Sequence, residues 1–406
     1  MSKVVNSLNI YVLLWFIEIQ NASMSLVPDS ISVLLLFFLF VWSFFCVFKV
    51  QYQARNIPFI GGLNSLLLLF SIYGLFRVIG GEQIIAYLGS GRAIGPREYL
   101  IEYWRSILPI YAFLYYSIKG QITEKTLLFW LIVFTIGSVC NYYYEENNRL
   151  AMIAAGSAID GVTNNQSYSF VALMAFLPFL EKRPLVQYSL LSFFVLFTIM
   201  GMKRGAILVG ILCIVLFLCR SYRQAKNFQK VTIVLFSIVT VFIGYLVVMW
   251  YIQNNVYFMT RVEDTLNGVS SGRDAIYKKL WDYFTTDMGI VQILFGLGAD
   301  GTFRAIGQAG HNDWIEVLID TGILGLSLYV LYWFKVAKTW ILAKRFLEDK
   351  IYLCIMIIFA SLLIKTAFSM SINDIKIYTS MPLGYCISKF LVSNRKQAVH
   401  QIEDCV

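Results

Sequence analysis

Long apolar segments, separated by short polar ones, recur along the whole chain. Each is about as long as the roughly 20 residues that an α-helix needs to cross the hydrocarbon core of a bilayer. Nothing alternates with period two over about ten residues, as the strands of a membrane β-barrel do. The pattern predicts about twelve transmembrane helices, at residues 8–28, 31–49, 58–79, 100–118, 126–144, 168–181, 186–202, 205–219, 231–252, 318–336, 350–369 and 376–393.

The first of these segments is the weakest, because Glu18 and Asn21 interrupt it. A short apolar run after Lys3 is also compatible with a signal peptide, but no clear small-residue cleavage site follows it. We therefore interpret this segment as the first membrane span.

The composition supports a membrane protein, since hydrophobic residues make up 58% of the 406 residues and charged residues 14%. A soluble domain carries about 25% charged residues. We find no internal repeat and no soluble domain, so residues 1–406 are expected to form one all-α transmembrane domain. Its one large external loop lies between the ninth and tenth helices, at residues 253–317.

Basic residues gather in one set of connecting loops, and the positive-inside rule makes that side cytoplasmic. Both termini are then cytoplasmic and the 253–317 loop is periplasmic. The net charge of +9 is largely this topological signal, so it indicates no nucleic acid partner. The basic residues of these loops and of the tail are Lys49, Arg55, Lys119, Lys125, Lys182, Arg183, Arg220, Arg223, Lys226, Lys230, Lys335, Lys338, Lys344, Arg345, Lys350, Lys389, Arg395 and Lys396.

The long loop contains a helix-start signal at Ser271-Gly272-Arg273-Asp274. Ser271 and Asp274 have the spacing of a capping box, with Ser271 as the N-cap. Apolar side chains at helical spacing follow, which predicts an amphipathic helix on the membrane surface or packed on the bundle. These apolar residues are Ile276, Leu280, Trp281 and Phe284.

Further along the loop, Gly296, Gly298 and Gly301 indicate an irregular turn. A second short helix is expected to start at Asn312, as its cap, and to run to Gly322, where glycine can end a helix. The loop would thus carry short helices rather than a separate domain.

Lys203 and Arg204 separate two apolar segments with no real loop between them, so these charges lie at or within the outer interface. A charge near the bilayer centre costs about 2.5–3.5 kcal/mol on insertion scales, and charges kept there usually face a cavity. The alternative is a snorkelling pair at a tight turn. Because basic residues are not favoured on this side, we interpret the pair as functional.

Arg273 would occupy the second position of the helix that Ser271 begins, where its charge opposes the helix dipole. An anion that binds both the guanidinium and the free N–H groups would explain this position. The alternative is a surface arginine paired with Asp274.

His311 directly precedes the second predicted helix, and such a histidine taken alone is more often structural than catalytic. Beside two arginine sites in one compartment, it becomes a candidate general base, because neutral imidazole accepts a proton near pH 7 and arginine does not. Arg261 and Arg304 are further basic residues of the same loop.

The sequence lacks the motifs of several common classes of enzyme. We find no phosphate-binding loop, dinucleotide fingerprint, nucleophile elbow or Asp-x-Asp pair, and no Cys/His spacing that suggests a metal site. The energy of a reaction would then come from the substrate itself. A lipid-linked pyrophosphate ester is activated in this way, and arginines could stabilise its anionic leaving group without a metal.

Five segments in this order resemble the family of O-antigen polymerases (Wzy) and O-antigen ligases (WaaL), over roughly the C-terminal half of the chain. The N-terminal half matches only in its general hydropathy. The segments are Lys203-Arg204-Gly205-Ala206, Ser271-Gly272-Arg273, Gly296-Leu297-Gly298, His311-Asn312 and Thr321-Gly322-Ile323-Leu324-Gly325.

The resemblance implies a multi-pass glycosyltransferase of the bacterial inner membrane that uses no cofactor. It would act on oligosaccharides linked to undecaprenyl pyrophosphate, with a chain-length regulator protein as a further partner. Arg204 and Arg273 would hold the pyrophosphate, and His311 would take the proton of the acceptor hydroxyl. Lys203, Arg261 and Arg304 would assist substrate binding, while Asn312 and Asp313 would orient the histidine, although Asn312 is equally well explained as a helix cap.

The polymerase is the function that we favour. A ligase would transfer the glycan to the lipid A core instead, and a capsule or exopolysaccharide polymerase would use another repeat. A flippase or transporter of lipid-linked sugars is the alternative of a different class, but transporters tend to have internal repeats and charged sites at the midplane. A structural scaffold would leave the position of Arg204 unexplained.

Overall fold

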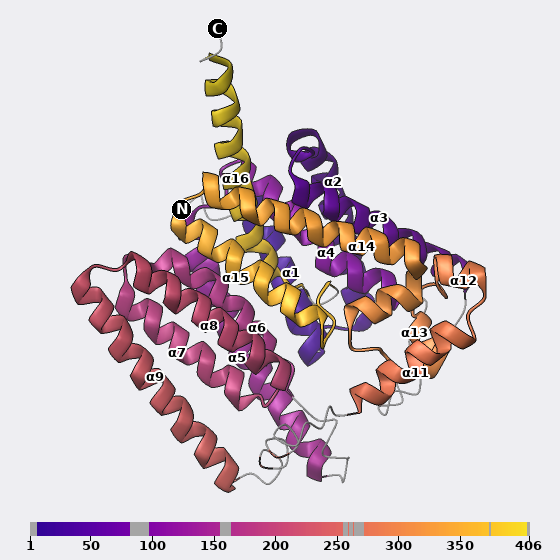
Figure 1. The fold of residues 1–406 in the computed structure, drawn as a ribbon, viewed down its shortest axis with the longest axis horizontal. Coiled ribbons are helices and arrows are strands. Elements are labelled where there is room, and N and C mark those ends of the chain that lie inside the picture. The colour runs from indigo at the N-terminus through magenta and orange to yellow at the C-terminus, as the bar shows by residue number, and fades with distance from the viewer. Residues whose placement is uncertain are drawn as a thin grey trace.

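The computed structural model describes residues 6–81, 97–154, 164–254, 272–372 and 375–403, together with Met259 and Glu263 (Figure 1). The regular elements of these residues are helices. They are α1 (Ser7–Met24), α2 (Asp29–Ala54), α3 (Pro58–Gly80), α4 (Glu98–Ile118), α5 (Glu124–Ala154), α6 (Ser167–Leu173), the 3₁₀ helix η2 (Met174–Leu180), α7 (Pro184–Met200), α8 (Arg204–Gln224), α9 (Asn227–Asn254), α11 (Arg273–Thr286), α12 (Ile290–Phe295), α13 (Gly301–Ile306), α14 (Asp313–Phe346), α15 (Asp349–Thr366) and α16 (Ile377–Glu403).

The protein is all-helical and polytopic, as predicted. Among the described residues, six helices are long and apolar enough to cross a membrane, namely α2, α3, α5, α8, α9 and α14. Two shorter apolar stretches, Ser167–Leu180 and Pro184–Met200, accompany them. Each of the predicted spans overlaps helical structure over most of its length.

Some predicted bounds shift for local reasons. α1 ends at Met24 rather than near residue 28, because Ser25 adopts a left-handed conformation (φ 53°) and its N–H bonds to the carbonyl of Asn21. α5 extends ten residues past the predicted end at 144, to Ala154. The segment 168–181 changes from α to 3₁₀ at Met174, before Pro178, whose ring nitrogen cannot donate a helical hydrogen bond.

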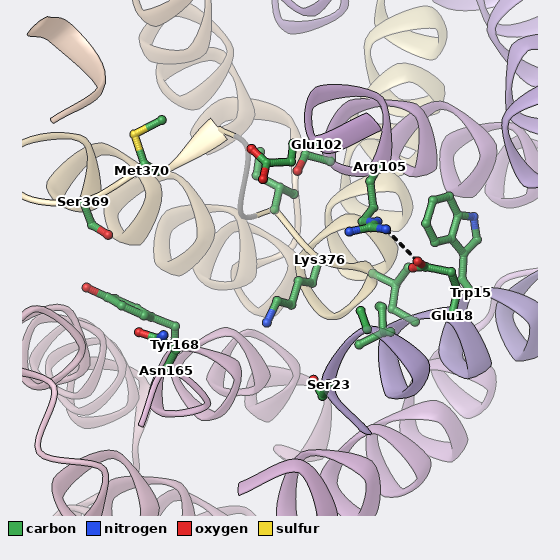
Figure 2. A pocket seen from close by; sticks show the side chains of 15 residues that line it. Trp15, Glu18, Ser23, Glu102, Arg105, Asn165, Tyr168, Ser369, Met370 and Lys376 are labelled. Carbon is green, nitrogen blue, oxygen red and sulfur yellow. Dashed lines mark hydrogen bonds and ion pairs between the residues drawn. The ribbon is translucent and has the colours of Figure 1, made fainter. Parts of the chain in front are cut away.

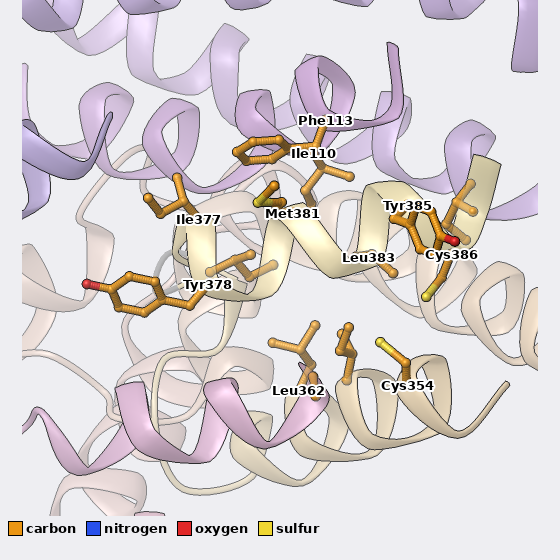
Figure 3. Close-up of a cluster of buried hydrophobic side chains, with 14 of the residues drawn as sticks. Ile110, Phe113, Cys354, Leu362, Ile377, Tyr378, Met381, Leu383, Tyr385 and Cys386 are labelled. Carbon is orange, nitrogen blue, oxygen red and sulfur yellow. The ribbon is translucent and has the colours of Figure 1, made fainter. Parts of the chain in front are cut away.

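α4 and α16 form the centre of the bundle, and most of the apolar side chains on both are buried. Figure 3 shows α16 between α4 and α15, with Ile110 and Phe113 of α4 above Met381 and with Leu362 and Cys354 of α15 below it. By contrast, α9 packs mainly on α7 and α8 and exposes most of its apolar side chains at the edge of the molecule (Figure 1). Exposed apolar surface of this extent indicates contact with lipid.

The loop helices α11, α12 and α13 pack against the first turns of α14. Leu280 and Met288 are buried there with Ile319, and Ile276 and Phe284 border this cluster. The predicted amphipathic helix is therefore confirmed, except that Trp281 is exposed rather than on the buried face.

The predicted cap of α11 is wrong. Gly272, with φ of 75°, is the N-cap residue, and Arg273 is the first residue of the helix rather than the second. Ser271 itself lies outside the described residues. A glycine adopts this left-handed backbone at little cost, and it allows the chain to turn sharply into the helix.

Asn312 is the N-cap of α14, since its Oδ1 accepts from the N–H groups of Trp314 and Ile315. The first part of α14 ends at Gly322 (φ 69°, ψ −170°), where the helix kinks before continuing towards Phe346. Both predictions, the cap at Asn312 and the end at Gly322, are confirmed.

The glycine-rich turn of the loop packs against the kink of α14. The N–H groups of Leu297 and Gly298 donate to the carbonyls of Ile319 and Asp320, at 2.8 and 2.9 Å. A Cβ at Gly296 would overlap the backbone of Asp320, and a Cβ at Gly322 would overlap the carbonyl of Leu294. The two glycines thus let two backbones meet directly, which fixes the loop on the bundle.

Candidate functional site

The turn between α7 and α8 is as tight as predicted, and it presents Lys203 and Arg204. Lys203 is the N-cap of α8 and Arg204 its first residue. Met202 before them has φ of 55°, a conformation uncommon for a residue with a side chain. The next residue, Gly205, has no room for a Cβ, which would clash with the hydroxyl of Tyr168 and the ring of Phe368.

Arg273 reaches the same place from the loop. Its Nη1 donates to the carbonyl oxygen of Phe368 at 2.6 Å, across 95 residues of sequence. Phe368, just beyond the end of α15, therefore joins the start of α8 to the start of α11. Two helix starts that bear arginines lie side by side as a result.

His311 is held by its backbone. Its φ is 52°, its N–H donates to Oε1 of Glu316 at 3.0 Å, and its carbonyl accepts from the hydroxyl of Tyr277 at 3.3 Å. Beside it, Nδ2 of Asn312 donates to the carbonyl of Ala367 at 2.9 Å. Contacts from α11, α14 and the end of α15 thus converge on this short segment. Strained backbone conformations often occur at functional positions, where the surrounding structure maintains them.

The electrostatics place the histidine beside the cations. Burial lowers the pKa of His311 below its ordinary value, and the positive charges of Arg273 and Lys203 lower it further. The residue is nevertheless exposed to solvent. Its imidazole is therefore neutral near pH 7 and can accept a proton. We refer to Lys203, Arg204, Arg273 and His311 as the His311 cluster.

Asp313 and Asn312 have structural partners. The carboxylate of Asp313 accepts from the N–H of Ser371 at 3.0 and 3.1 Å and from the hydroxyl of Tyr329 at 3.0 Å. Asn312 caps α14, so the explanation of this residue as a helix cap holds. The residues that bond to the backbone of His311 are Glu316 and Tyr277, which the sequence did not single out.

Arg304 lies with a different group of charges. Its Nη1 donates to the carbonyl of Leu297 at 3.0 Å, and it lies near Asp300. Asp300 forms an ion pair of 2.5 Å with Arg77 of α3, yet burial raises the pKa of its carboxyl to about 6 despite Arg77 and Arg304. These contacts hold the glycine-rich turn. Arg261 lies outside the described residues.

Lys365 is a further cation that the sequence analysis missed. It is 6% exposed near the end of α15, and its Nζ lies 4.2 Å from the centre of the Tyr168 ring. Tyr168 also packs at Gly205, so Lys365 borders the His311 cluster. The available signal was a lysine within a predicted apolar span, because such charges usually face a cavity or a partner.

A cavity of about 380 Å³, lined by charged and apolar side chains, lies next to the cluster, and Tyr168 is part of its wall. It extends from Ser369 and Lys376, between α15 and α16, to Glu18 of α1 and Arg105 of α4 (Figure 2). Within the described ranges, no group of three or more His, Cys, Asp and Glu side chains could hold a metal ion.

These features define a class of protein: a polytopic helical membrane protein with basic side chains and a neutral histidine gathered at one end of the bundle. The comparisons agree with this class. Residues 188–330 match the family model described as O-antigen ligase (Wzy_C), and this segment contains the four residues of the His311 cluster. This match supports the family of O-antigen polymerases and ligases for this part of the chain, and that family is glycosyltransferase-like and acts on lipid-linked glycans. No curated protein matches the chain.

Proposed function

We propose that the protein is an O-antigen polymerase, which joins oligosaccharide repeats carried on undecaprenyl pyrophosphate at the outer face of the bacterial inner membrane. In this proposal the chain crosses the membrane twelve times, with both termini in the cytoplasm and residues 253–317 in the periplasm. The observation that carries the proposal is the position of His311 next to α11, whose Tyr277 bonds to the His311 carbonyl and whose first residue, Arg273, is held by Phe368.

The reaction is a single displacement. His311 takes the proton of an acceptor sugar hydroxyl, and the oxygen of that hydroxyl attacks the anomeric carbon of the donor. The bond from the anomeric carbon to the pyrophosphate oxygen breaks, and the lipid pyrophosphate leaves as an anion. Arg204 and Arg273 stabilise the charge that develops on it. The configuration at the anomeric carbon is inverted.

The imidazole must lose its proton again before the next turnover, which its lowered pKa favours. The start of α8 and the start of α11 lie beside each other at Phe368, so one anion can contact both arginines. The free N–H groups at these helix starts add to the attraction for phosphate.

The proposal is tested in a strain deleted for this gene and complemented with the wild type or with His311→Ala. The wild type is expected to restore a ladder of surface lipopolysaccharide, and His311→Ala to leave core that bears a single repeat. The measurement is the electrophoretic profile, with membrane levels of both proteins matched by immunoblot. An unchanged ladder with His311→Ala would refute the role of the histidine.

A ligase is the second candidate, and the description of the matching family model as O-antigen ligase favours it. A ligase would transfer the finished glycan to the lipid A core. The same deletion strain would then show bare core, with polymer accumulating on the lipid carrier. The polymerase and the ligase would both act by a single displacement, so both must invert the configuration at the anomeric carbon. A product that retained the donor configuration would contradict this mechanism.

The lowered pKa of His311 predicts a particular pH profile. Because the neutral imidazole is the active form, kcat/KM is expected to fall as the pH drops through this pKa, with a midpoint below the ordinary histidine value of about 6.5. Lys203→Gln removes a nearby positive charge, so it should raise the pKa and move the midpoint to higher pH. Lys338→Gln, on α14, is the control. Coinciding profiles for Lys203→Gln and the wild type would contradict this electrostatic coupling.

A further inference from the structure

The cavity beside the His311 cluster is walled by buried charge. Oε1 of Glu18 accepts from Nη2 of Arg105 at 2.7 Å, and Glu18 is only 1% exposed. Oε2 of Glu18 and Nε of Arg105 are buried and have no hydrogen-bond partner among the described residues. The side chain of Arg105 as a whole is 33% exposed, so a ligand in the cavity can reach its guanidinium, which Glu18 holds in place.

The remaining wall combines charged side chains with apolar ones such as Trp15 and Ile19. Figure 2 shows Glu102 and Lys376 near the Glu18–Arg105 pair, with Tyr168 on the opposite side. Two carboxylates and two cations face one space, so their charges balance. A pyrophosphate anion has no net attraction here, in contrast to the His311 cluster. A hydrocarbon chain would cover these charged groups without any hydrogen bond to them, which is unfavourable.

The cavity is next to the reaction site. Tyr168 lines it and also packs at Gly205, the residue after Arg204. Ser369 lines it too and directly follows Phe368, whose carbonyl binds Arg273. A ligand that extends from the two arginines can therefore enter the cavity without leaving the protein surface.

We propose that this cavity is a sugar-binding subsite, which takes a hydroxyl-rich, uncharged ring of the glycan that is joined at the His311 cluster. This rests on the proposed function, because the neighbouring reaction supplies the glycan. The exposed part of the Arg105 guanidinium donates to a sugar oxygen, and the ion pair with Glu18 fixes its orientation. A volume of about 380 Å³ lies within the range of small-molecule sites.

The test is binding of a lipid-free probe, the repeat-unit oligosaccharide released from the polysaccharide of the source strain. Calorimetry uses the full chain in lipid nanodiscs. Glu18→Gln is expected to weaken binding about tenfold, since hydrogen bonds to charged groups are stronger than neutral ones. The control Glu124→Gln removes a glutamate that pairs with Lys350. It should bind the probe like the wild type.

A second variant leaves the ion pair intact. Ser23 lines the cavity from the last turn of α1, so Ser23→Trp should fill the space and abolish binding, while Ser23→Ala should not. Thermal unfolding confirms that each variant is folded. Wild-type affinity in both Glu18→Gln and Ser23→Trp, or no binding by the wild type, would overturn the subsite.

Two modified probes identify the bound ring. Loss of affinity after reduction of the probe to its alditol assigns the cavity to the reducing-end sugar of the donor. Loss after removal of the non-reducing terminal sugar assigns it to the acceptor. His311→Ala separates this proposal from the proposed function, since it should bind the probe like the wild type and yet form no polymer. If the protein bound the probe but the deletion strain kept an unchanged lipopolysaccharide ladder, the polymerase function would be refuted and the sugar-binding subsite would not.

Discussion

Arg273→Ala is expected to lower the rate of glycan transfer by about 10²–10³, with a smaller effect on substrate binding. In other enzymes, a hydrogen-bond donor that points at the charge developing in the transition state changes kcat by a factor of this size. Arg273 is placed for this role by the bond of its Nη1 to the carbonyl of Phe368, which fixes the guanidinium near His311. The measurement is kcat for polymer formation with purified enzyme and lipid-linked repeat.

Two further variants show whether the charge or the geometry matters. Arg273→Lys keeps the charge, but one ammonium cannot hold the carbonyl and a phosphate in the forked geometry of a guanidinium, so we expect only partial activity. Lys279→Ala removes a positive charge from the exposed side of the same helix and should leave kcat unchanged. If Arg273→Ala transferred glycan at the wild-type rate, the pyrophosphate role of this residue would be wrong.

Gly322→Ala is expected to detach the loop from α14 and to abolish transfer, while the membrane bundle stays folded. The conformation of Gly322 (φ 69°, ψ −170°) is nearly restricted to glycine and costs another residue on the order of 1–3 kcal/mol. The added Cβ would also overlap the carbonyl of Leu294, a backbone group that cannot swing aside. The hydrogen bonds of Leu297 and Gly298 to α14 would be lost with this contact.

The measurements for Gly322→Ala are limited proteolysis of the loop, thermal unfolding and transfer activity. Gly307→Ala is the matched control, because Gly307 also has a positive φ of 75°, but nothing lies within 4 Å of its Cβ position. It should show the backbone cost alone, with the loop still docked. Equal protease resistance and activity in Gly322→Ala and the wild type would mean that the glycine contact does not hold the loop.

Local signals sufficed for much of the fold. The helical spans could be predicted because a bilayer requires long apolar runs, and these are visible residue by residue. The cap at Asn312 and the kink at Gly322 depend on properties of single residues, which explains why both predictions are confirmed. The N-cap of α11 was predicted at Ser271, but the structure has it at the adjacent Gly272. Both residue types occur before helices, so the sequence alone did not decide between them.

The members of the His311 cluster could be singled out from sequence because their charges lie where a membrane protein has little reason to keep them. Their proximity could not be predicted. It depends on Phe368, whose carbonyl binds Arg273 and whose ring packs at Gly205, and no local pattern links these three positions. Lys365 was missed for the same reason, since only its place beside Tyr168 shows its relation to the cluster.

By itself, the sequence determined that this protein is a helical membrane protein and singled out Lys203, Arg204, Arg273 and His311, because hydropathy and charge are properties of consecutive residues. Only the tertiary structure decided that Glu18 and Arg105 wall a cavity beside Tyr168. Apolar packing of whole helices sets which polar side chains become neighbours, so such a site is decided by contacts between residues far apart in the chain.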